Sequence, residues 1–248
     1  MITFIEPFIS NKSLAENSQK SYRYDLQQFC HHVGQRINQD RLALYKQSLS
    51  SLSVSAKKRK LSIVNQFLHY LYQENILSDY YHIDDKTHKT TPRQPLFSSL
   101  ELSAVYEAQP VSNGQLIALL ILELGLTPND IAHLKMADIN LDFNIMTIQS
   151  PKGMRVVKLT NRLVPFLAPV ISDKQVYLFG LGAEPLSRQW YFNQLKGFLH
   201  RIGQGHLSAQ TLREQFILAQ RLSGKSIIEV SQMLGLKSPI TLEKYYKS

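Results

Sequence analysis

Arg213 and Tyr245, near the end of the sequence, are residue types that could act together on a phosphodiester bond. A tyrosine hydroxyl can attack as a nucleophile and form a covalent intermediate. An arginine can neutralise the charge that develops on the phosphoryl oxygens during the attack. Each residue also has a structural interpretation, because Tyr245 and Tyr246 could anchor a terminal helix and Arg213 could pair with Glu214. The chemistry therefore depends on what else accompanies the two residues.

Other catalytic patterns fail on inspection. The Gly203-Gln-Gly205 segment lacks the third glycine and the preceding strand of a dinucleotide-binding loop, and the sequence contains no GKS, GKT or HExxH motif. Cys30 is the single cysteine, which excludes an internal disulfide framework and a zinc site with several thiolates. We interpret Cys30 as a small residue within a helix.

Basic residues suggest a second kind of chemistry, the binding of an anion. Lys57, Lys58, Arg59 and Lys60 are four successive cations at the expected start of a helix. Cations at this end of a helix oppose its dipole, so contact with phosphate groups would explain why they are there. A solvated helix start is an equal alternative, since charge runs are common on protein surfaces.

The composition favours an anionic partner such as nucleic acid or an acidic membrane face. The sequence has 28 Lys and Arg against 19 Asp and Glu, a formal charge of +9. Residues 1–95 hold 13 basic and 8 acidic residues, and residues 96–248 hold 15 and 11. The excess is shared, so we expect the partner to contact both parts of the chain.

Hydropathy argues against a membrane. The longest apolar run, residues 116–122, is far too short to cross a bilayer, and residues 1–6 lack the layout of a secretion signal. We expect a soluble, cytoplasmic protein that does not contact a membrane.

The first part of the chain is predicted to be a helical bundle. Apolar residues recur at helical spacing along three segments, with Ser18 placed to cap the first. These segments are residues 17–33, 39–49 and 55–73. Residues 84–95 then contain no apolar residue other than two prolines, which indicates an exposed linker. We therefore predict a domain of residues 1–83, a linker of residues 84–95 and a domain of residues 96–248.

The second part of the chain is predicted to be helical around a small hairpin. Residues 138–149 alternate between apolar and polar, which favours a strand, and a turn at 150–153 leads into a second strand at 154–159. Helical periodicity marks residues 99–108, 114–124, 188–199, 211–222 and 227–234.

Four segments of this second part resemble the catalytic domain of tyrosine site-specific recombinases, the phage integrase family, especially the XerC and XerD type. They are residues 125–134 with 137–140, the hairpin with a lysine at its turn, residues 210–213, and residues 234–245. Residues 17–29 are similar to the opening of that family's helical, SAM-like core-binding domain. The resemblance implies a mainly α fold of two domains, a helical bundle and a mostly helical catalytic-type domain with a small antiparallel sheet.

The resemblance also implies a chemistry. In this family a tyrosine attacks DNA and becomes joined to its 3′-phosphate, and no metal or other cofactor takes part. Matched position by position, Tyr245 corresponds to the nucleophile, Arg213 to the second arginine and Lys152 to the hairpin lysine. Arg155 or Lys158 could take the role of Lys152 instead, because the turn is short.

The helix expected from Arg188 would approach DNA on the same resemblance. Arg188 and Gln189 would then reach phosphates or base edges. Trp190 and Phe192 are expected to pack inside.

Three positions depart from the family pattern. Thr127 stands where the family has its first arginine, Gln210 where it has a histidine, and Leu236 where it has histidine or tryptophan. Residues 127–130 instead suit a helix start, with threonine as the cap, proline at the first helical position and an acid in the first turn. Gln210 could still donate a hydrogen bond, but Leu236 cannot.

These departures predict a degenerate active site. Loss of one preorganised donor typically slows such a reaction on the order of 10²–10³-fold. We therefore expect a protein that binds double-stranded DNA but has weak or lost strand cleavage. The alternatives are an active site-specific recombinase that uses Tyr245, and an interaction protein that associates with itself or with another, active recombinase on DNA.

Overall fold

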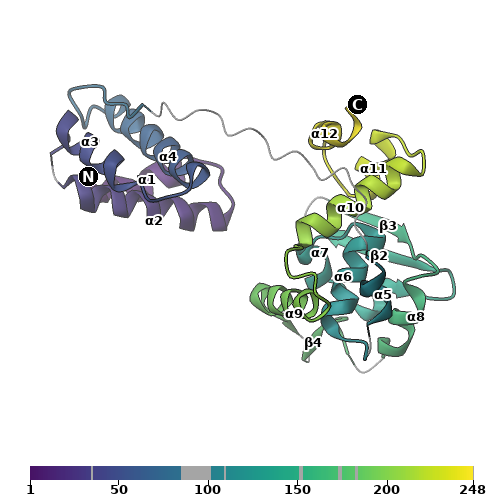
Figure 1. Ribbon diagram of the computed structural model, residues 1–248. Helices are drawn as coiled ribbons and strands as arrows, with labels where there is room; N and C mark the ends of the chain where they lie inside the picture. The colour runs from purple at the N-terminus through teal and green to yellow at the C-terminus, as the bar shows by residue number, and fades with distance from the viewer. Residues whose placement is uncertain are drawn as a thin grey trace. The chain divides into compact units, whose positions relative to one another are not determined.

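The computed structural model describes residues 1–34, 36–84, 102–108, 110–150, 153–172, 175–181 and 184–247. The chain divides into two compact units, residues 1–92 and 93–248 (Figure 1). This division falls within the predicted linker, of which residues 85–95 lie outside the described residues. Each unit has its own hydrophobic core, so each is described by itself.

The first unit is a bundle of helices. Its elements are η1 (Ile2–Phe4), α1 (Ile5–Ser10), α2 (Glu16–Val33), α3 (Gln39–Ser48) and α4 (Val54–Gln73). The core lies between α2 and α4, where Leu26, Phe29, Val64 and Phe67 are fully buried. Phe8 of α1, an element that the sequence analysis did not predict, packs edge-on against Phe67.

Helix starts in this unit follow the side chains that cap them. Asn38 caps α3 and Ser53 caps α4, each by accepting a hydrogen bond from a backbone amide three residues later. The prediction that Ser18 caps the first long helix was wrong, because α2 already begins at Glu16 and Ser18 lies in its first turn.

The second unit wraps its helices around α6. Its elements are α5 (Ser103–Glu107), α6 (Asn113–Leu124), α7 (Pro128–Ala132), η2 (Met136–Asp138), β1 (Ile139–Asn140), β2 (Ile145–Ser150), β3 (Gly153–Lys158), α8 (Val164–Leu167), η3 (Ala168–Val170), β4 (Gly180–Leu181), β5 (Glu184–Pro185), α9 (Arg188–Arg201), α10 (Ala209–Leu222), α11 (Ile227–Met233), η4 (Pro239–Leu242) and α12 (Glu243–Tyr246). Helix α6 is buried along almost its whole length. A Cβ atom at Gly114 would lie 2.3 Å from the backbone oxygen of Gln194, so this glycine lets α6 and α9 approach closely.

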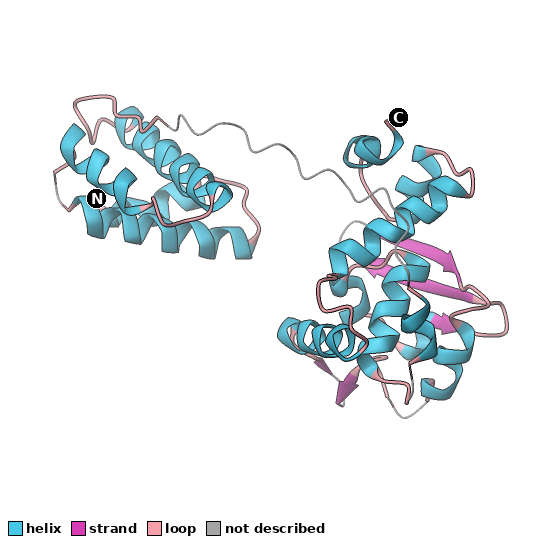
Figure 2. Cartoon of the chain, in the orientation of Figure 1, coloured by secondary structure: helices cyan, strands magenta, loops and turns pink. Residues whose placement is uncertain are grey.

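A three-stranded antiparallel sheet, in the order β1-β2-β3, lies beside these helices (Figure 2). Ser150 pairs with Gly153, so residues 151 and 152 connect β2 to β3. The single strand predicted over residues 138–149 was wrong. The chain turns between β1 and β2, where Asn144 adopts a positive φ of 51° and the side chain of Asn140 accepts a hydrogen bond from the amide of Phe143. The predicted fold class, mainly α with a small antiparallel sheet, is confirmed.

The last helices form a small core of their own within the second unit. Phe216, Val230, Leu234, Leu242 and Tyr245 are among its buried members. Helix α12 is held there by backbone carbonyl groups, since Arg221 donates to the carbonyl of Tyr245 and the Tyr246 hydroxyl donates to that of Lys225. None of the described helices is both long and apolar enough to cross a membrane.

Candidate active site and basic surface

Tyr245 lies on α12 with its side chain buried against the core of the last helices; 2% of its surface is exposed. Its hydroxyl donates a hydrogen bond of 3.0 Å to Oε1 of Glu214 on α10. The ammonium group of Lys244 lies 4.7 Å from the centre of the phenol ring. The candidate nucleophile is therefore held by a carboxylate from the neighbouring helix.

Glu214 collects the polar groups around this tyrosine. The same Oε1 atom accepts a hydrogen bond of 3.1 Å from Nε2 of Gln210 and lies 3.7 Å from Nζ of Lys244. Glu214 is thus committed to Tyr245, Gln210 and Lys244, which leaves the suggested Arg213–Glu214 pair without support among the described contacts. Glu214 was not among the site residues predicted from the sequence. Its spacing of four from Gln210 on one helix was the available signal.

The surroundings of Tyr245 favour the neutral phenol. Burial raises the pKa of Tyr245, the hydrogen bond to Glu214 and the charge of that carboxylate raise it further, and nearby Arg213 opposes them. The net shift is upward, so Tyr245 holds its proton more strongly than an ordinary tyrosine does.

Arg213 lies on α10, partly buried, beside the candidate nucleophile. Burial lowers the pKa of Arg213, while Asp130 and Tyr245 counteract this shift. The Nε atom of Arg213 is buried and makes no hydrogen bond with any described group. The side chain therefore holds one buried donor that has no partner among the described residues.

A cavity of about 370 Å³ joins these residues. It is lined by Gln210, Arg213, Ile217, Leu234, Leu236, Thr241, Leu242, Lys244 and Tyr245. The structure thus brings the two candidate catalytic residues, Arg213 and Tyr245, together with the two altered positions Gln210 and Leu236.

Thr127 caps α7 as predicted. Its side chain accepts a hydrogen bond of 3.1 Å from the amide of Asp130, and Oδ2 of Asp130 accepts one of 2.9 Å from the amide of Thr127. The same Oδ2 atom accepts a hydrogen bond of 3.1 Å from Nη2 of Arg155 on β3. Thr127 supplies no cation. The guanidinium of Arg155, however, binds the same Asp130 carboxylate that accepts the hydrogen bond from the amide of Thr127.

Three residues were predicted as candidates for the role of the hairpin lysine, and the structure describes two of them. Lys152 lies outside the described residues. Of its two alternatives, Lys158 is exposed at the end of β3, and Arg155 is largely buried against Asp130.

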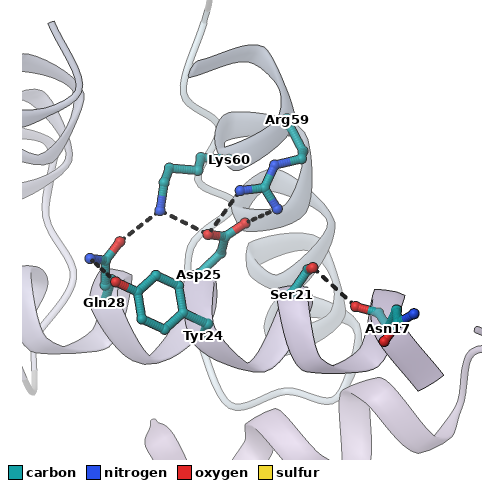
Figure 3. Close-up of polar contacts among 7 residues, drawn as sticks. All are labelled: Asn17, Ser21, Tyr24, Asp25, Gln28, Arg59 and Lys60. Atoms are coloured by element: carbon teal, nitrogen blue, oxygen red, sulfur yellow. Dashed lines mark hydrogen bonds and ion pairs between the residues drawn. The ribbon is translucent and has the colours of Figure 1, made fainter. Parts of the chain in front are cut away.

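The basic run at the start of α4 is divided between solvent and the interior of the first unit. Arg59 binds Asp25 of α2 through two nitrogens, at 2.7 and 3.3 Å, and Nζ of Lys60 lies 2.8 Å from Asp25 and 2.6 Å from Gln28 (Figure 3). The side chain of Asp25 is 1% exposed and that of Lys60 10%, whereas that of Arg59 is 49% exposed. Lys57 and Lys58 are also partly exposed.

Asp25 was not predicted as part of this cluster because it lies on α2, 34 and 35 residues before the cations Arg59 and Lys60 on α4. A carboxylate directly before the buried Leu26 was the available signal. A second cavity of about 370 Å³ lies at this place, lined by Asn17, Ser18, Ser21, Tyr22, Arg59, Ser62 and Ile63. Arg59 thus lines a hollow beside its contact with Asp25.

Arg188 and Gln189 lie exposed in the first turn of α9, whose start is capped by Ser187. Trp190 packs on Phe179 with ring centres 5.9 Å apart, in agreement with its predicted inward position. Phe192 was predicted to pack inside and does not, because its place on the helix turns it outward and leaves it 56% exposed.

Comparison with known proteins gives two kinds of similarity. Residues 1–75 match the family described as "Phage integrase, N-terminal SAM-like domain". The whole chain resembles solved structures. XerH site-specific recombinase bound to difH substrate is 18% identical, with a TM-score of 0.70 over 99% of this chain and 82% of that one. A lambda integrase dimer bound to a COC' core site is 15% identical, with a TM-score of 0.75 over 99% and 76%.

XerA recombinase is 18% identical to the chain and has a TM-score of 0.54, over 100% of this chain and 92% of that one. At such identities the three structures establish a shared fold. The match thus covers the N-terminal domain, and the whole chain shares the fold of these recombinases and of lambda integrase.

Proposed function

We propose that the protein is a XerD-like member of the tyrosine recombinase family that binds double-stranded DNA and has weak or lost strand cleavage. Binding is supported by the similar structures of XerH bound to difH substrate, of lambda integrase bound to a COC' core site and of the Tn1549 transposon integrase in complex with circular intermediate DNA. It is also supported by the formal charge of +9, which is shared between the two units.

The hydrogen bond from Tyr245 to Glu214 is the observation that carries the proposal of weak cleavage. To attack a phosphodiester, the hydroxyl must lose its proton while negative charge grows on the phosphoryl oxygens. A carboxylate at this place opposes both changes, because it raises the pKa of Tyr245 and repels the phosphate. Leu236 contributes no donor, and the Gln210 amide is already bonded to Glu214.

The proposed DNA surface lies on both units. In the first unit it contains Lys57, Lys58 and Arg59, which are at least partly exposed, while Lys60 acts by fixing Asp25 and α2. In the second unit it contains Arg188 and Gln189 at the start of α9. Phosphate contacts by such residues position DNA without reading its sequence.

Active strand cleavage by Tyr245 is the second candidate function, and one observation favours it. Arg213 and Tyr245 line the same cavity, and Arg213 retains an unused buried donor. A nucleophile and a cation for the phosphoryl oxygens are therefore both in place.

Two measurements test the proposal. Gel-shift titrations with a random-sequence duplex should give binding that weakens strongly as salt rises from low to moderate concentration. Affinity that stays flat with salt would contradict the proposed DNA surface.

The second measurement uses a duplex that the protein has selected from a random-sequence pool by binding. A nick near the scissile phosphate makes this duplex a suicide substrate, which would trap any covalent adduct. We expect little or no adduct. An efficient adduct that Tyr245→Phe abolishes would establish the second candidate function instead.

A further inference from the structure

Helix α9 carries a continuous exposed face along its length. Exposed residues recur in pairs one helical turn apart, at 188–189, 192–193 and 196–197, while the opposite side of the helix is buried in the core of the second unit. The α9 face, at the edge of that unit in Figure 1, consists of Arg188, Gln189, Phe192, Asn193, Lys196 and Gly197.

The α9 face is basic. Arg188 and Lys196 are its cations, and α9 contains no aspartate or glutamate that could neutralise them. With a rise of about 1.5 Å per residue, these two positions lie about 12 Å apart along the helix axis. The major groove of B-DNA is also about 12 Å wide and admits an α-helix. The α9 face therefore complements duplex DNA in charge and in dimensions.

Gly197 is unusual among the glycines that the structure describes. A Cβ atom there would meet nothing within 4 Å, which is also true of Gly153, Gly203 and Gly224, but those three have positive φ angles. Gly197 has no positive φ and lies inside a helix, where glycine is less stable than alanine. Neither the backbone nor the packing requires glycine at this position. A bare backbone on the exposed side of α9 instead gives room to a partner that approaches the helix closely.

Phe192 places an aromatic ring between the two cations. The residue is 56% exposed, and Nζ of Lys196 lies 5.7 Å from the centre of its ring. Phe192 also lines a cavity of about 360 Å³ together with Arg188, Leu195 and Lys196. Apolar surface and both cations thus occur at one place on the protein.

The uncharged side chains of the α9 face suit the major-groove edge of an A·T pair. Thymine exposes there a C5-methyl group, which apolar side chains contact, and adenine exposes a donor and an acceptor that glutamine can bind. Gln189 donates one N–H to Oδ1 of Asn193 at 2.9 Å and so retains its oxygen and its second N–H. The carboxylate that would suit the amino group of cytosine is absent from α9.

We propose that Phe192 determines specificity by contacting the C5-methyl group of a thymine in the major groove, and that Gly197 allows α9 to approach the base edges. The assignment rests on the proposed function, because it requires a protein that binds duplex DNA. It adds to that function a preference for thymine at one position of the bound site, whereas contacts to phosphates alone carry no sequence preference.

The test replaces thymine by 2′-deoxyuridine, one position at a time, in a duplex that the full-length protein has selected from a random-sequence pool. Each exchange removes one methyl group and leaves base pairing and phosphates unchanged. Gel-shift titrations should find a position at which the exchange weakens binding about three- to tenfold. Phe192→Ala should bind the thymine duplex more weakly by a similar factor, and the exchange at that position should then have no further effect.

Phe143→Ala is the matched control. Phe143 is another exposed phenylalanine, 74% accessible in the turn between β1 and β2, so its replacement should leave the response to deoxyuridine intact. The proposal is overturned if no exchange weakens binding, or if Phe192→Ala responds to the exchanges as the unmodified protein does. Failure of the unmodified protein to bind any duplex would contradict the proposed function itself, so the two failures are distinguishable.

Gly197→Ala tests the close approach of α9 separately. Alanine favours the helix and its methyl group meets open space, so the thermal midpoint should rise by about 2–4 °C. Binding of the selected duplex should nevertheless weaken, because the methyl group lies between the helix and the bases. Misfolding would not explain weaker binding by a more stable variant. Binding as tight as that of the unmodified protein would overturn the close approach.

Discussion

At the residue scale, the chemistry of the candidate site depends on which groups surround one phenol. Glu214 binds the hydroxyl of Tyr245, and Arg213 lies nearby with an unused donor. The carboxylate and the guanidinium act in opposite directions on the pKa of Tyr245, and burial reinforces the carboxylate. Glu214, the residue after Arg213, therefore matters as much to the pKa of Tyr245 as Arg213 does.

Glu214→Gln should lower the pKa of Tyr245, because the amide carries no charge while the charge of Arg213 remains. Burial is unchanged, so the pKa should stay above that of a free tyrosine. NMR of protein with 13C-labelled tyrosine, titrated from about pH 8 to about pH 12, would follow the change. The resonance is assigned by its loss in Tyr245→Phe. Glu184→Gln, at an exposed site on β5, should have no effect, and an equal Tyr245 titration in Glu214→Gln would contradict the role given to Glu214.

At the element scale, helix α4 is attached to α2 by charges as well as by apolar packing. Asp25 is buried beneath Arg59 and Lys60, so part of the basic run that suggested a binding surface stabilises the bundle. A buried charge that loses its partner is strongly destabilising.

Asp25→Leu should destabilise the first unit by about 3–5 kcal/mol, because it leaves the buried ammonium of Lys60 without its carboxylate. The double variant with Lys60→Met should recover most of this loss. Urea unfolding followed by far-UV circular dichroism reports on the helices of both units. Fluorescence of Trp190, the single tryptophan, reports on the second unit and should be unchanged. Equal stability of Asp25→Leu and the unmodified protein would show that the charge cluster is dispensable.

The sequence predicted elements better than contacts. Helical periodicity located seven helices to within a few residues, because the apolar spacing of each is visible within one continuous segment of the sequence. These helices are α2, α3, α4, α6, α9, α10 and α11. The break between β1 and β2 was missed because apolar residues continue to alternate through the turn at residues 141–144. The pairing of Arg155 with Asp130, and of Glu214 with Tyr245, joins elements distant in the chain, and spacing along the sequence does not encode such pairs.

At the scale of the whole molecule, the two units share the positive charge, and DNA binding should depend on both. Each cation that contacts a phosphate contributes about one to the slope of log affinity against log salt. DNA binding should depend on both units whether or not Tyr245 can cleave DNA.

Lys57→Gln in the first unit and Arg188→Gln in the second should each weaken DNA binding and reduce the salt slope by about 1. Their effects should add, because the two sites lie in separate units. Gel-shift titrations at several salt concentrations would measure both quantities. Lys20→Gln removes an exposed cation that pairs with Glu16 and should change little. If one of the two variants had no effect, its unit would not belong to the proposed DNA surface.

Stability of the protein should decrease at alkaline pH. Burial raises the pKa of Tyr191 to about 12 and also raises those of Tyr45, Tyr106 and Tyr245. The unfolded chain ionises near the ordinary value of 10.0, so it releases these protons first as the pH rises. The contribution of these tyrosines to the free energy of unfolding should therefore be constant below about pH 10 and fall above it. Urea unfolding across this range would measure the decline, and Tyr191→Phe should make it shallower.

The way in which α12 is fastened has a consequence for how this protein could change. The Arg221 guanidinium and the Tyr246 hydroxyl hold the helix through carbonyl oxygens of the main chain, which every residue type possesses. These two contacts therefore do not involve the side chains at 214, 236 and 245. A donor introduced at 210 or 236 would leave both contacts of α12 in place, so the missing donors could be reinstated one at a time beside a helix that is already anchored.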